Sequence, residues 1–246
     1  MKILTFNIRY PEPSDGDNIW ENRRAAVVQT IRHSAAAVVG LQEPVLEQLQ
    51  YFDAALPAYR RFGVSRYGNE DEKFTALLYR PDTLDLLGQG AFWLSQTPDI
   101  PASSSWLIHK PYAVNWGHFK HLPTGRNFHV YNTHFPYKPE QAEARVQSAK
   151  LLLERAQGDC VFLTGDFNSP APGPVHDILT TRFHDSWTGN GDGTFHGFTG
   201  LPTGRRLDWI LYRGPVTVES CDAITSTVNG RYPSDHFPVL GSFRFA

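Results

Sequence analysis

Residues 160–168 read Cys-Val-Phe-Leu-Thr-Gly-Asp-Phe-Asn, and Pro170 follows two positions later. An apolar run of this length, bounded by turn-forming residues, is typical of a buried β-strand. The run ends at Asp166, whose carboxylate is costly to bury unless it is paired or bound to a metal. The stretch therefore predicts a core strand that carries functional groups at its end.

Short apolar runs of the same kind recur between glycine, proline and aspartate residues. They cover residues 3–8, 37–41, 76–79, 128–131, 207–212 and 238–245. Stretches with helical apolar spacing lie between them, in residues 20–31, 45–56 and 139–158. No composition break, repeat or low-complexity linker divides the chain. The pattern predicts a single α/β domain over residues 1–246.

Three further strands end in polar residues. Asn7, Glu43 and His134 each follow an apolar run, and a proline stands within four positions of each of them. Strands that stop together can bring such side chains to one rim of the fold. We therefore expect these groups to lie near Asp166 and Asn168.

Two segments near the C-terminus add more acids and an imidazole. Asp208 lies in Leu207-Asp208-Trp209-Ile210, and Asp235 and His236 directly precede Phe237-Pro238-Val239. Taken alone, such residues are often structural, as turn asparagines, helix-start carboxylates or hydrogen-bonded histidines. The whole set together is much harder to explain in that way, and it predicts a functional site.

Composition excludes several classes of protein. Lys and Arg number 23 and Asp and Glu 25, so the net charge of −2 excludes a protein that coats DNA by charge alone. The 41% hydrophobic content, with 16 Phe and 6 Trp, excludes a disordered chain. Cys160 and Cys221 are too few for a disulfide framework or a four-sulfur zinc site.

The sequence contains no stretch long enough for a membrane span and no signal-peptide core. We expect a cytoplasmic protein that acts as a monomer, although a leader removed during maturation would leave no trace in this sequence.

Six segments in order resemble the motifs of the endonuclease/exonuclease/phosphatase superfamily, the deoxyribonuclease I-like proteins. They are Thr5-Phe6-Asn7-Ile8-Arg9, Leu41-Gln42-Glu43, Asn132-Thr133-His134-Phe135, Thr164-Gly165-Asp166-Phe167-Asn168, Arg206-Leu207-Asp208-Trp209-Ile210 and Ser234-Asp235-His236-Phe237-Pro238-Val239. The continuation after Asn7 and residues 18–23 look more like the deadenylase and sphingomyelinase side of the family than like exonuclease III. The resemblance implies a four-layer α/β sandwich, in which helices flank two packed mixed β-sheets and the site lies at one edge.

The resemblance also implies a metal site formed by Asn7, Glu43 and Asp235. Two carboxylates and a neutral amide oxygen suit a hard cation such as Mg²⁺ or Mn²⁺. Zinc would favour cysteine or histidine ligands, and the sequence contains no such cluster.

The catalytic groups follow from the same matches. Asp166 resembles the residue that orients or deprotonates the attacking water, and Asn168 resembles one that holds the water or a phosphate oxygen. His134 and His236 resemble the pair that hydrogen-bonds the phosphoryl oxygens, with Asp208 steering His236. An imidazole held in this way stabilises negative charge that develops on the oxygens.

Candidate substrate-binding residues rest on weaker signals. Arg9 and Lys110 could supply positive potential, Tyr79 resembles a family position that contacts the phosphate, and Phe195 could form an aromatic rim with His196 and Phe198. Further aromatic residues that could line a compact pocket are Trp106, Tyr112 and Trp116.

These features predict a divalent-metal-dependent phosphoesterase that acts on a phosphate ester by in-line attack of water. The low net charge favours a small or short phosphomonoester or phosphodiester over nucleic acid. The first alternative is a nuclease acting on DNA or RNA. The second is a catalytically silent module that binds a phosphorylated ligand, but the presence of Glu43, Asp166 and His236 argues against it.

Overall fold

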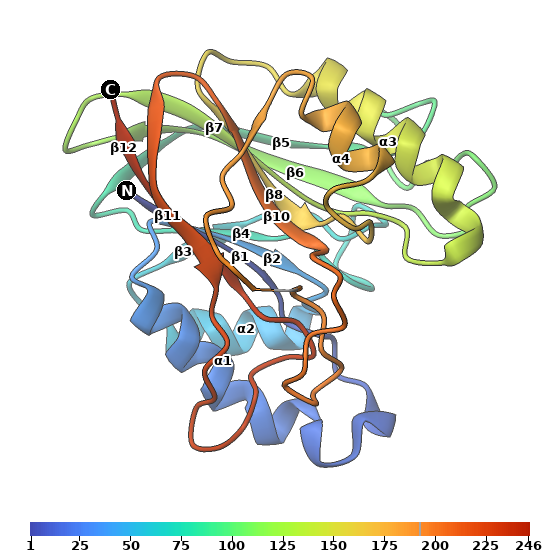
Figure 1. Ribbon diagram of the computed structural model, residues 1–246, viewed down its shortest axis with the longest axis vertical. Coiled ribbons are helices and arrows are strands. Elements are labelled where there is room, and N and C mark those ends of the chain that lie inside the picture. The colour runs from blue at the N-terminus through green and yellow to red at the C-terminus, as the bar shows by residue number, and fades with distance from the viewer. Residues whose placement is uncertain (192) are drawn as a thin grey trace.

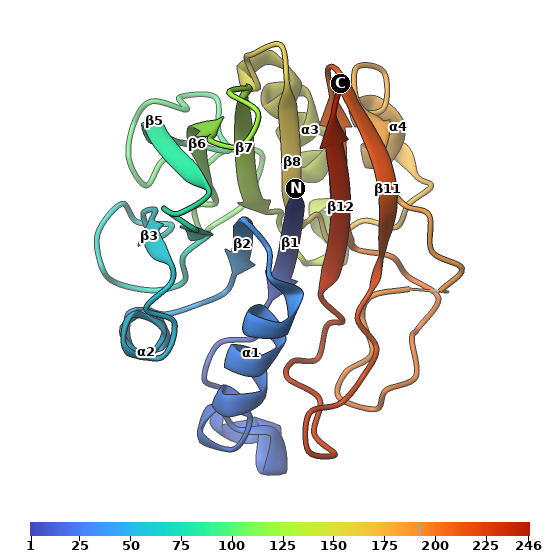
Figure 2. The ribbon, with the colours of Figure 1, turned by 90° about the vertical axis from the view of Figure 1, so that its left-hand side faces the viewer.

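The computed structural model describes residues 1–191 and 193–246, in which two six-stranded β-sheets pack face to face (Figures 1 and 2). The first sheet has the strand order β11-β12-β1-β2-β4-β3, and the second has the order β5-β6-β7-β8-β10-β9. Each sheet contains both parallel and antiparallel pairs. The predicted architecture of two packed mixed sheets is therefore confirmed.

The strands of the two sheets have the following bounds. In the first sheet they are β1 (Lys2–Asn7), β2 (Val38–Gln42), β3 (Arg60–Phe62), β4 (Leu77–Tyr79), β11 (Val216–Ala223) and β12 (Val239–Phe245). In the second sheet they are β5 (Leu84–Trp93), β6 (Ala113–His121), β7 (Asn127–His134), β8 (Val161–Asp166), β9 (His184–Asp185) and β10 (Asp208–Arg213).

Helices cover the outer faces of both sheets and complete the four layers (Figure 1). They are α1 (Trp20–Ser34) and α2 (Leu46–Ala55) on the first sheet, and α3 (Ala142–Arg155) and α4 (Pro174–Leu179) on the second. The short 3₁₀ turns η1 (Pro13–Asn18) and η2 (Pro139–Gln141) precede α1 and α3. In the described part of the chain, none of these helices is both long and apolar enough to cross a membrane.

Three apolar layers hold the sandwich together. Side chains of both sheets, including Ile3, Phe119 and Phe162, form the layer between the sheets. A second layer lies between the first sheet and α1 and α2, and a third between the second sheet and α3 and α4. Every residue of β2 and β8 is buried because both faces of these strands are covered, which explains the uninterrupted apolar run that ends at Asp166.

The two sheets approach closely where the side chain of Asn132 crosses between them. Asn132 Nδ2 donates to the carbonyl oxygens of Leu41 and Ala76, at 2.9 and 3.0 Å, and its Oδ1 accepts from Gln42 Nε2 at 2.7 Å. A buried amide is tolerated in an apolar layer when its hydrogen bonds are satisfied in this way. Gly40 makes room for the amide on the opposing sheet.

We expect Gly40→Ala to destabilise the protein by about 1–3 kcal/mol, the usual cost of overpacking a core. A Cβ at this position would lie 2.5 Å from Asn132 Oδ1 and 2.6 Å from Thr164 Oγ1. Urea denaturation measures the loss. The matched control is Gly88→Ala on β5, where the nearest atoms are 3.9 Å from the added Cβ. Equal stability of the two variants would contradict the packing described for Gly40.

Candidate active site

Strand register brings three of the predicted catalytic residues into one row at the edge of the second sheet. The parallel pairing of β7 with β8 places His134 opposite Asp166, and the antiparallel pairing of β10 with β8 places Asp208 on the other side of Asp166. The polar residues that end separate apolar runs in the sequence are thus neighbours in space.

The first sheet supplies the facing groups. Asn7 ends β1, Glu43 follows β2, and Asp235 and His236 precede β12, which pairs with β1. Asn7 Nδ2 donates a 2.9 Å hydrogen bond to Asp166 Oδ2 and so connects the ends of the two sheets. The predicted convergence of strand ends is therefore present in the structure.

Three residues at this rim have a left-handed backbone conformation. The φ angles are 56° at Arg9, 71° at Glu43 and 48° at Asn168. Non-glycine residues rarely adopt this conformation, and it is maintained only where the surrounding structure enforces it. Each of these residues follows the end of a central strand, where the chain turns sharply and its side chain enters the cleft.

His236 is held by a carboxylate at the floor of the cleft. Its Nδ1 lies 2.8 Å from Asp208 Oδ2, and its Nε2 lies 3.8 Å from Asp166 Oδ2. Burial alone would lower the pKa of His236, but Asp208 and Asp166 outweigh burial and raise this pKa to about 10. The ring is therefore positively charged at neutral pH, and its Nε2 faces Asp166.

His134 has the opposite electrostatic character. Its Nε2 lies 3.5 Å from Asp166 Oδ2. Burial lowers the pKa of His134 to about 4, although Asp166 and Glu43 oppose the change. This ring is neutral at physiological pH, and it can offer a hydrogen bond without adding a second charge.

Asp166 is oriented by two donors. The backbone N–H of Asn168 donates to Oδ1 at 2.9 Å, and Asn7 Nδ2 donates to Oδ2. Burial raises the pKa of Asp166, and the neighbouring Asp208 adds to this effect. A fixed carboxylate with raised basicity suits a group that accepts a proton from water.

Asn168 is held in turn by its own side chain. Its Nδ2 donates to the carbonyl oxygen of Phe135 at 2.9 Å, and the residue lines the cleft beside Asp166. The amide is therefore fixed in place beside Asp166.

The donor set predicted for a metal fits a hard cation. Asn7, Glu43 and Asp235 all line the cleft, and each is less than 10% exposed. Burial raises the pKa of Glu43, but Lys73, whose Nζ lies 3.1 Å from Oε2, acts together with other neighbours such as the backbone N–H of Tyr10. Together they outweigh burial, and the pKa falls to about 2. The carboxylate is therefore ionised at neutral pH, as a ligand for Mg²⁺ or Mn²⁺ must be.

A second set of potential ligand atoms comes from Asp166, Asp208 and His236, which lie within 4.8 Å of one another. The buried cluster could hold an ion. The short bond between His236 and Asp208 occupies one atom of each, however, and that pairing favours a proton over a metal at this place.

A cleft of about 840 Å³ opens above these groups. Arg9, Lys110 and Phe195 line it, as the sequence predicts for substrate-binding residues. Arg9 forms an ion pair with Asp15, Lys110 forms one with Glu72, and Phe195 packs edge-on against His236 with 5.0 Å between ring centroids. Phe198 also lines the cleft.

The prediction that Tyr79 contacts the substrate is wrong. The residue is 7% exposed on β4 and packs between the sheets, with its ring centroid 5.5 Å from that of Phe119. Its side chain lies in the core and not in the cleft, so we withdraw Tyr79 as a substrate contact.

Three other predicted aromatic residues also pack away from the cleft. His196 stacks on Phe237 at 3.9 Å, while Trp106 and Trp116 lie against the apolar layer under α3 and α4.

Several residues that line the cleft escaped the sequence analysis. They are Tyr10, Arg66, Lys73, Tyr137 and Arg205. Lys73 lies 3.5 Å from the ring centroid of Tyr10 as well as beside Glu43. Residues 65–73 resemble an ordinary polar loop, and only the tertiary fold brings Arg66 and Lys73 to His134.

Comparison with known proteins agrees with this fold. Residues 4–236 match the family model described as "Endonuclease/Exonuclease/phosphatase family". A solved structure of a protein of that family from Bacteroides thetaiotaomicron is 32% identical, with a TM-score of 0.93, and the match covers 100% of this chain and 98% of the other. A second structure, a mannosyl-6-phosphatase from the same species, is 31% identical with a TM-score of 0.91, and both chains are covered completely.

A weaker similarity links the chain to an RNA-degrading enzyme. A probable CCR4-Not complex 3′-5′-exoribonuclease subunit Ccr4 from Encephalitozoon cuniculi is 26% identical over 162 residues. The match covers 50% of this chain and 33% of that protein, so the chain spans about a third of its relative's length.

Proposed function

Because the chain belongs to the endonuclease/exonuclease/phosphatase family, we propose that it is a divalent-metal-dependent phosphoesterase that hydrolyses a small or short phosphate ester. The observation that carries the proposal is the row of Asp208, Asp166 and His134 beneath His236, at the floor of a cleft that also holds an ionised Glu43. These groups can supply the proton acceptor, the hydrogen-bond donors and the metal ligand that attack of water at phosphorus requires.

Asn7, Glu43 and Asp235 would hold the metal. When bound, a divalent cation there polarises a phosphoryl oxygen and offsets the negative charge that develops on it. Asn7 also donates to Asp166, so the same residue orients a catalytic carboxylate.

The chain's own residues carry the remaining steps. Asp166 accepts a proton from the attacking water, whose oxygen forms a bond to phosphorus as the opposite phosphorus–oxygen ester bond breaks. The departing alcohol oxygen takes a proton from solvent. The charged Nε2 of His236 and the neutral ring of His134 hydrogen-bond the phosphoryl oxygens, and Asp208 keeps His236 in the required orientation.

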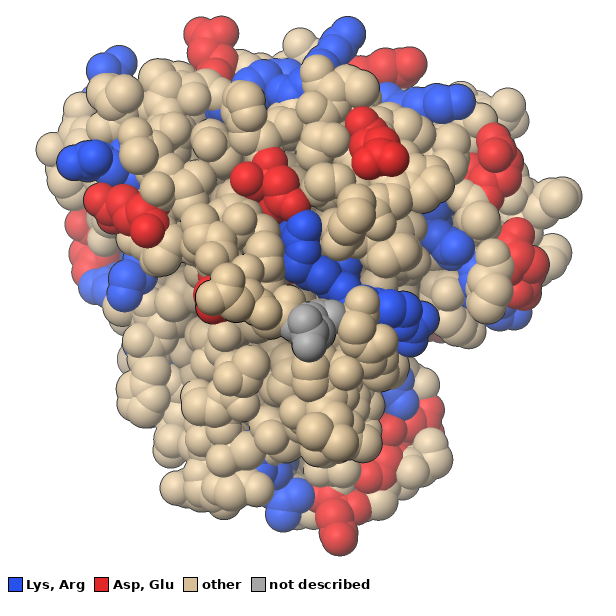
Figure 3. Space-filling model, in the orientation of Figure 1, with Lys and Arg blue, Asp and Glu red and all other residues tan. Residues whose placement is uncertain are grey.

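Cleft size and surface charge favour a small substrate. The space of about 840 Å³ is within the range of small-molecule sites. On the face drawn in Figure 3, basic side chains form a short row and are otherwise interspersed with acidic ones. This face lacks the broad basic surface that binds duplex DNA by phosphate contacts. The similarity to a mannosyl-6-phosphatase supports a sugar phosphate as the first substrate to test.

The test is a substrate panel assayed with Mg²⁺ and with Mn²⁺. It contains mannose 6-phosphate, glucose 6-phosphate, p-nitrophenyl phosphate, bis-p-nitrophenyl phosphate, oligoadenylate and a DNA duplex. We expect measurable turnover of one or more small esters and weak or no cleavage of the duplex at physiological salt. Efficient cleavage of nucleic acid with negligible turnover of small esters would replace the proposal with a nuclease.

A further inference from the structure

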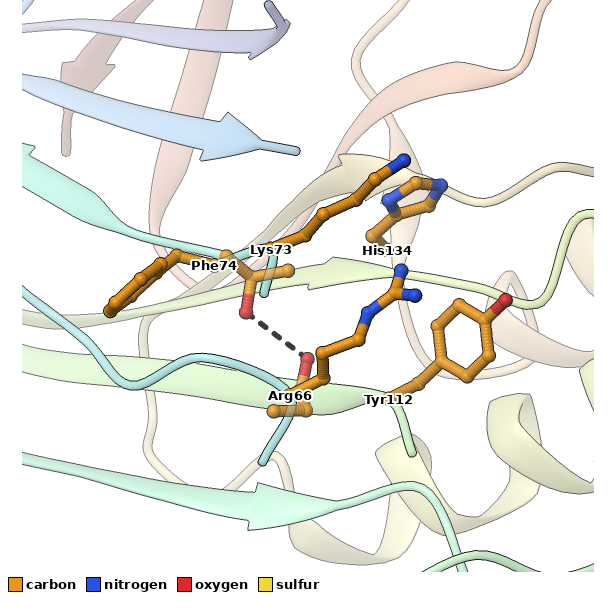
Figure 4. Close-up of a pocket in the computed structure, with 7 residues that line it drawn as sticks. Arg66, Lys73, Phe74, Tyr112 and His134 are labelled. Carbon is orange, nitrogen blue, oxygen red and sulfur yellow. Dashed lines mark hydrogen bonds between the residues drawn. The ribbon is translucent and has the colours of Figure 1, made fainter. Parts of the chain in front are cut away.

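Arg66 is a buried cation of the active-site cleft, and its guanidinium has no ion-pair partner in the part of the chain that the structure describes. Its residue is 7% exposed, and it lines the active-site cleft together with Lys73 and His134. Among the described residues, its guanidinium donates no hydrogen bond and has no carboxylate oxygen within 4.0 Å. Figure 4 shows the guanidinium beside the ring of Tyr112 and close to His134, with the ammonium group of Lys73 directed toward the same space.

The other two buried arginines of the described chain are satisfied by the protein itself. Arg23 donates to the carbonyl oxygens of Asn18 and Arg9, at 2.9 and 2.7 Å, among others. Arg145 donates to those of Pro136 and Lys138, at 2.9 and 2.7 Å. Burying a charge without partners is costly. Because Arg66 lacks the hydrogen bonds that Arg23 and Arg145 make, its guanidinium can bind an anion that enters the cleft.

The fold holds Arg66 rigidly in this position. Its backbone N–H donates to the carbonyl oxygen of Lys73 at 3.0 Å, and its own carbonyl accepts from Trp93 Nε1 at 2.6 Å. The guanidinium lies 4.7 Å from the ring centroid of Tyr112, a cation–π distance. The guanidinium N–H groups of Arg66 are therefore already positioned at the cleft in the absence of a ligand.

The other cations of the cleft are engaged elsewhere. Arg9 pairs with Asp15, Lys110 with Glu72, and Lys73 with Glu43. Arg205 lies exposed at the rim, above the ring of Phe195 at 5.5 Å. Among the arginine and lysine residues of the described part of the cleft, Arg66 is thus the deep one without a carboxylate partner.

A small pocket adjoins the cleft and shares Arg66, Lys73 and His134 with it. The cavity there has a volume of about 10 Å³. Its walls are formed by Arg66, Lys73, Phe74, Thr75, Tyr112, Ala113 and His134. This is room for about one water molecule. This small pocket therefore cannot hold a second ester group beside the guanidinium.

From the small size of this pocket and the unpaired guanidinium, we propose that Arg66 selects phosphomonoesters by binding the terminal phosphate dianion. The inference rests on the proposed phosphoesterase activity and names its substrate class. A monoester has three non-bridging oxygens and a charge near −2 at neutral pH, which match the forked donors of arginine. A diester has one charge fewer, and its second alcohol would not fit the small pocket beside the guanidinium.

The test compares Arg66→Met with Arg24→Met in the metal-loaded enzyme. Arg24 is a matched control because it also stacks on a tyrosine, Tyr51 at 5.1 Å, but is exposed on α1. We expect Arg66→Met to lower kcat/KM for p-nitrophenyl phosphate by about 10²–10³-fold, the scale of a lost oxyanion donor. Turnover of bis-p-nitrophenyl phosphate should change little, and Arg24→Met should match the wild type on both esters. An equal loss on both esters would overturn the proposal.

Thermal unfolding with and without inorganic phosphate separates recognition from structure. Removing an unpaired buried charge should leave the melting temperature of Arg66→Met unchanged or raise it. Phosphate should stabilise the wild type and Arg24→Met, but not Arg66→Met. A lower melting temperature together with an undiminished phosphate effect would assign Arg66 a structural role and overturn the proposal.

Two further outcomes complete the test. If Arg66→Met fails to fold, Arg66→Lys carries the test, because it keeps the charge but loses the planar fork. An unchanged monoester-to-diester ratio in Arg66→Lys would then overturn the proposal. If the wild type hydrolyses no phosphate ester, the proposed function fails, while the phosphate-dependent melting temperature still decides whether Arg66 binds the anion.

Discussion

Asp166→Asn and His236→Ala are each expected to lower kcat by about 10²-fold or more, the scale of a general base or of an oxyanion-stabilising group. Asparagine keeps the shape of Asp166 but cannot accept the proton of the attacking water. Alanine removes the charged imidazole whose Nε2 faces Asp166 at 3.8 Å. Steady-state kinetics on the best ester of the panel, with melting temperatures to verify folding, measure both losses.

Three control variants are expected to lose less activity or none. Asp208→Asn should do less damage than His236→Ala, because Asp208 acts only by holding His236. Asp82→Asn and His33→Ala alter exposed residues outside the cleft and should retain wild-type kcat. A His236→Ala enzyme with near wild-type kcat would show that the imidazole is structural and that the proposed chemistry is wrong.

Removal of divalent metal is expected to abolish turnover, and Mg²⁺ or Mn²⁺ is expected to restore it. The reason is the all-oxygen donor set of Asn7, Glu43 and Asp235 in the cleft. Activity after EDTA treatment and dialysis, followed by titration with each cation, measures the dependence. Full turnover of a metal-free preparation would contradict the assignment.

Metal binding can also be measured without catalysis. Glu43→Gln and Asp235→Asn should weaken the binding of Mn²⁺, followed by calorimetry, while preserving the fold. Glu219→Gln, which changes an exposed carboxylate on β11, is the matched control and should bind Mn²⁺ as the wild type does. Unchanged affinity in both site variants would place the ion elsewhere, with Asp166, Asp208 and His236 as the next set to test.

Local sequence predicts the positions of the candidate site residues correctly where a fully buried strand ends in a sharp turn. An apolar run marks a strand buried on both faces, and the polar residue at its end marks the rim, as Asp166 and Glu43 illustrate. The helices predicted in residues 20–31, 45–56 and 139–158 correspond to α1, α2 and η2 with α3. β5 escaped prediction because its residues alternate between exposed and partly buried, and because Gly88 and Gly90 interrupt its pattern.

The parts of the site that were missed or mistaken depend on contacts between distant segments. Arg66 and Lys73 lie in a polar loop, and nothing local indicates that the fold carries them to His134. Tyr79 was misplaced because position within a strand does not reveal which face the side chain occupies when all three residues of β4 are buried. Such positions follow from sheet packing, which no single segment encodes.

The central claim is that this cleft directs water to phosphorus, and hydrolysis in ¹⁸O-labelled water tests it most directly. The wild-type enzyme, loaded with Mg²⁺, is incubated with the best small ester of the panel, and both products are analysed by mass spectrometry. The account predicts one ¹⁸O atom in the phosphate group of the phosphorylated product, which is inorganic phosphate for a monoester, and an unlabelled alcohol. Label in the alcohol, or no hydrolysis of any ester, would contradict it.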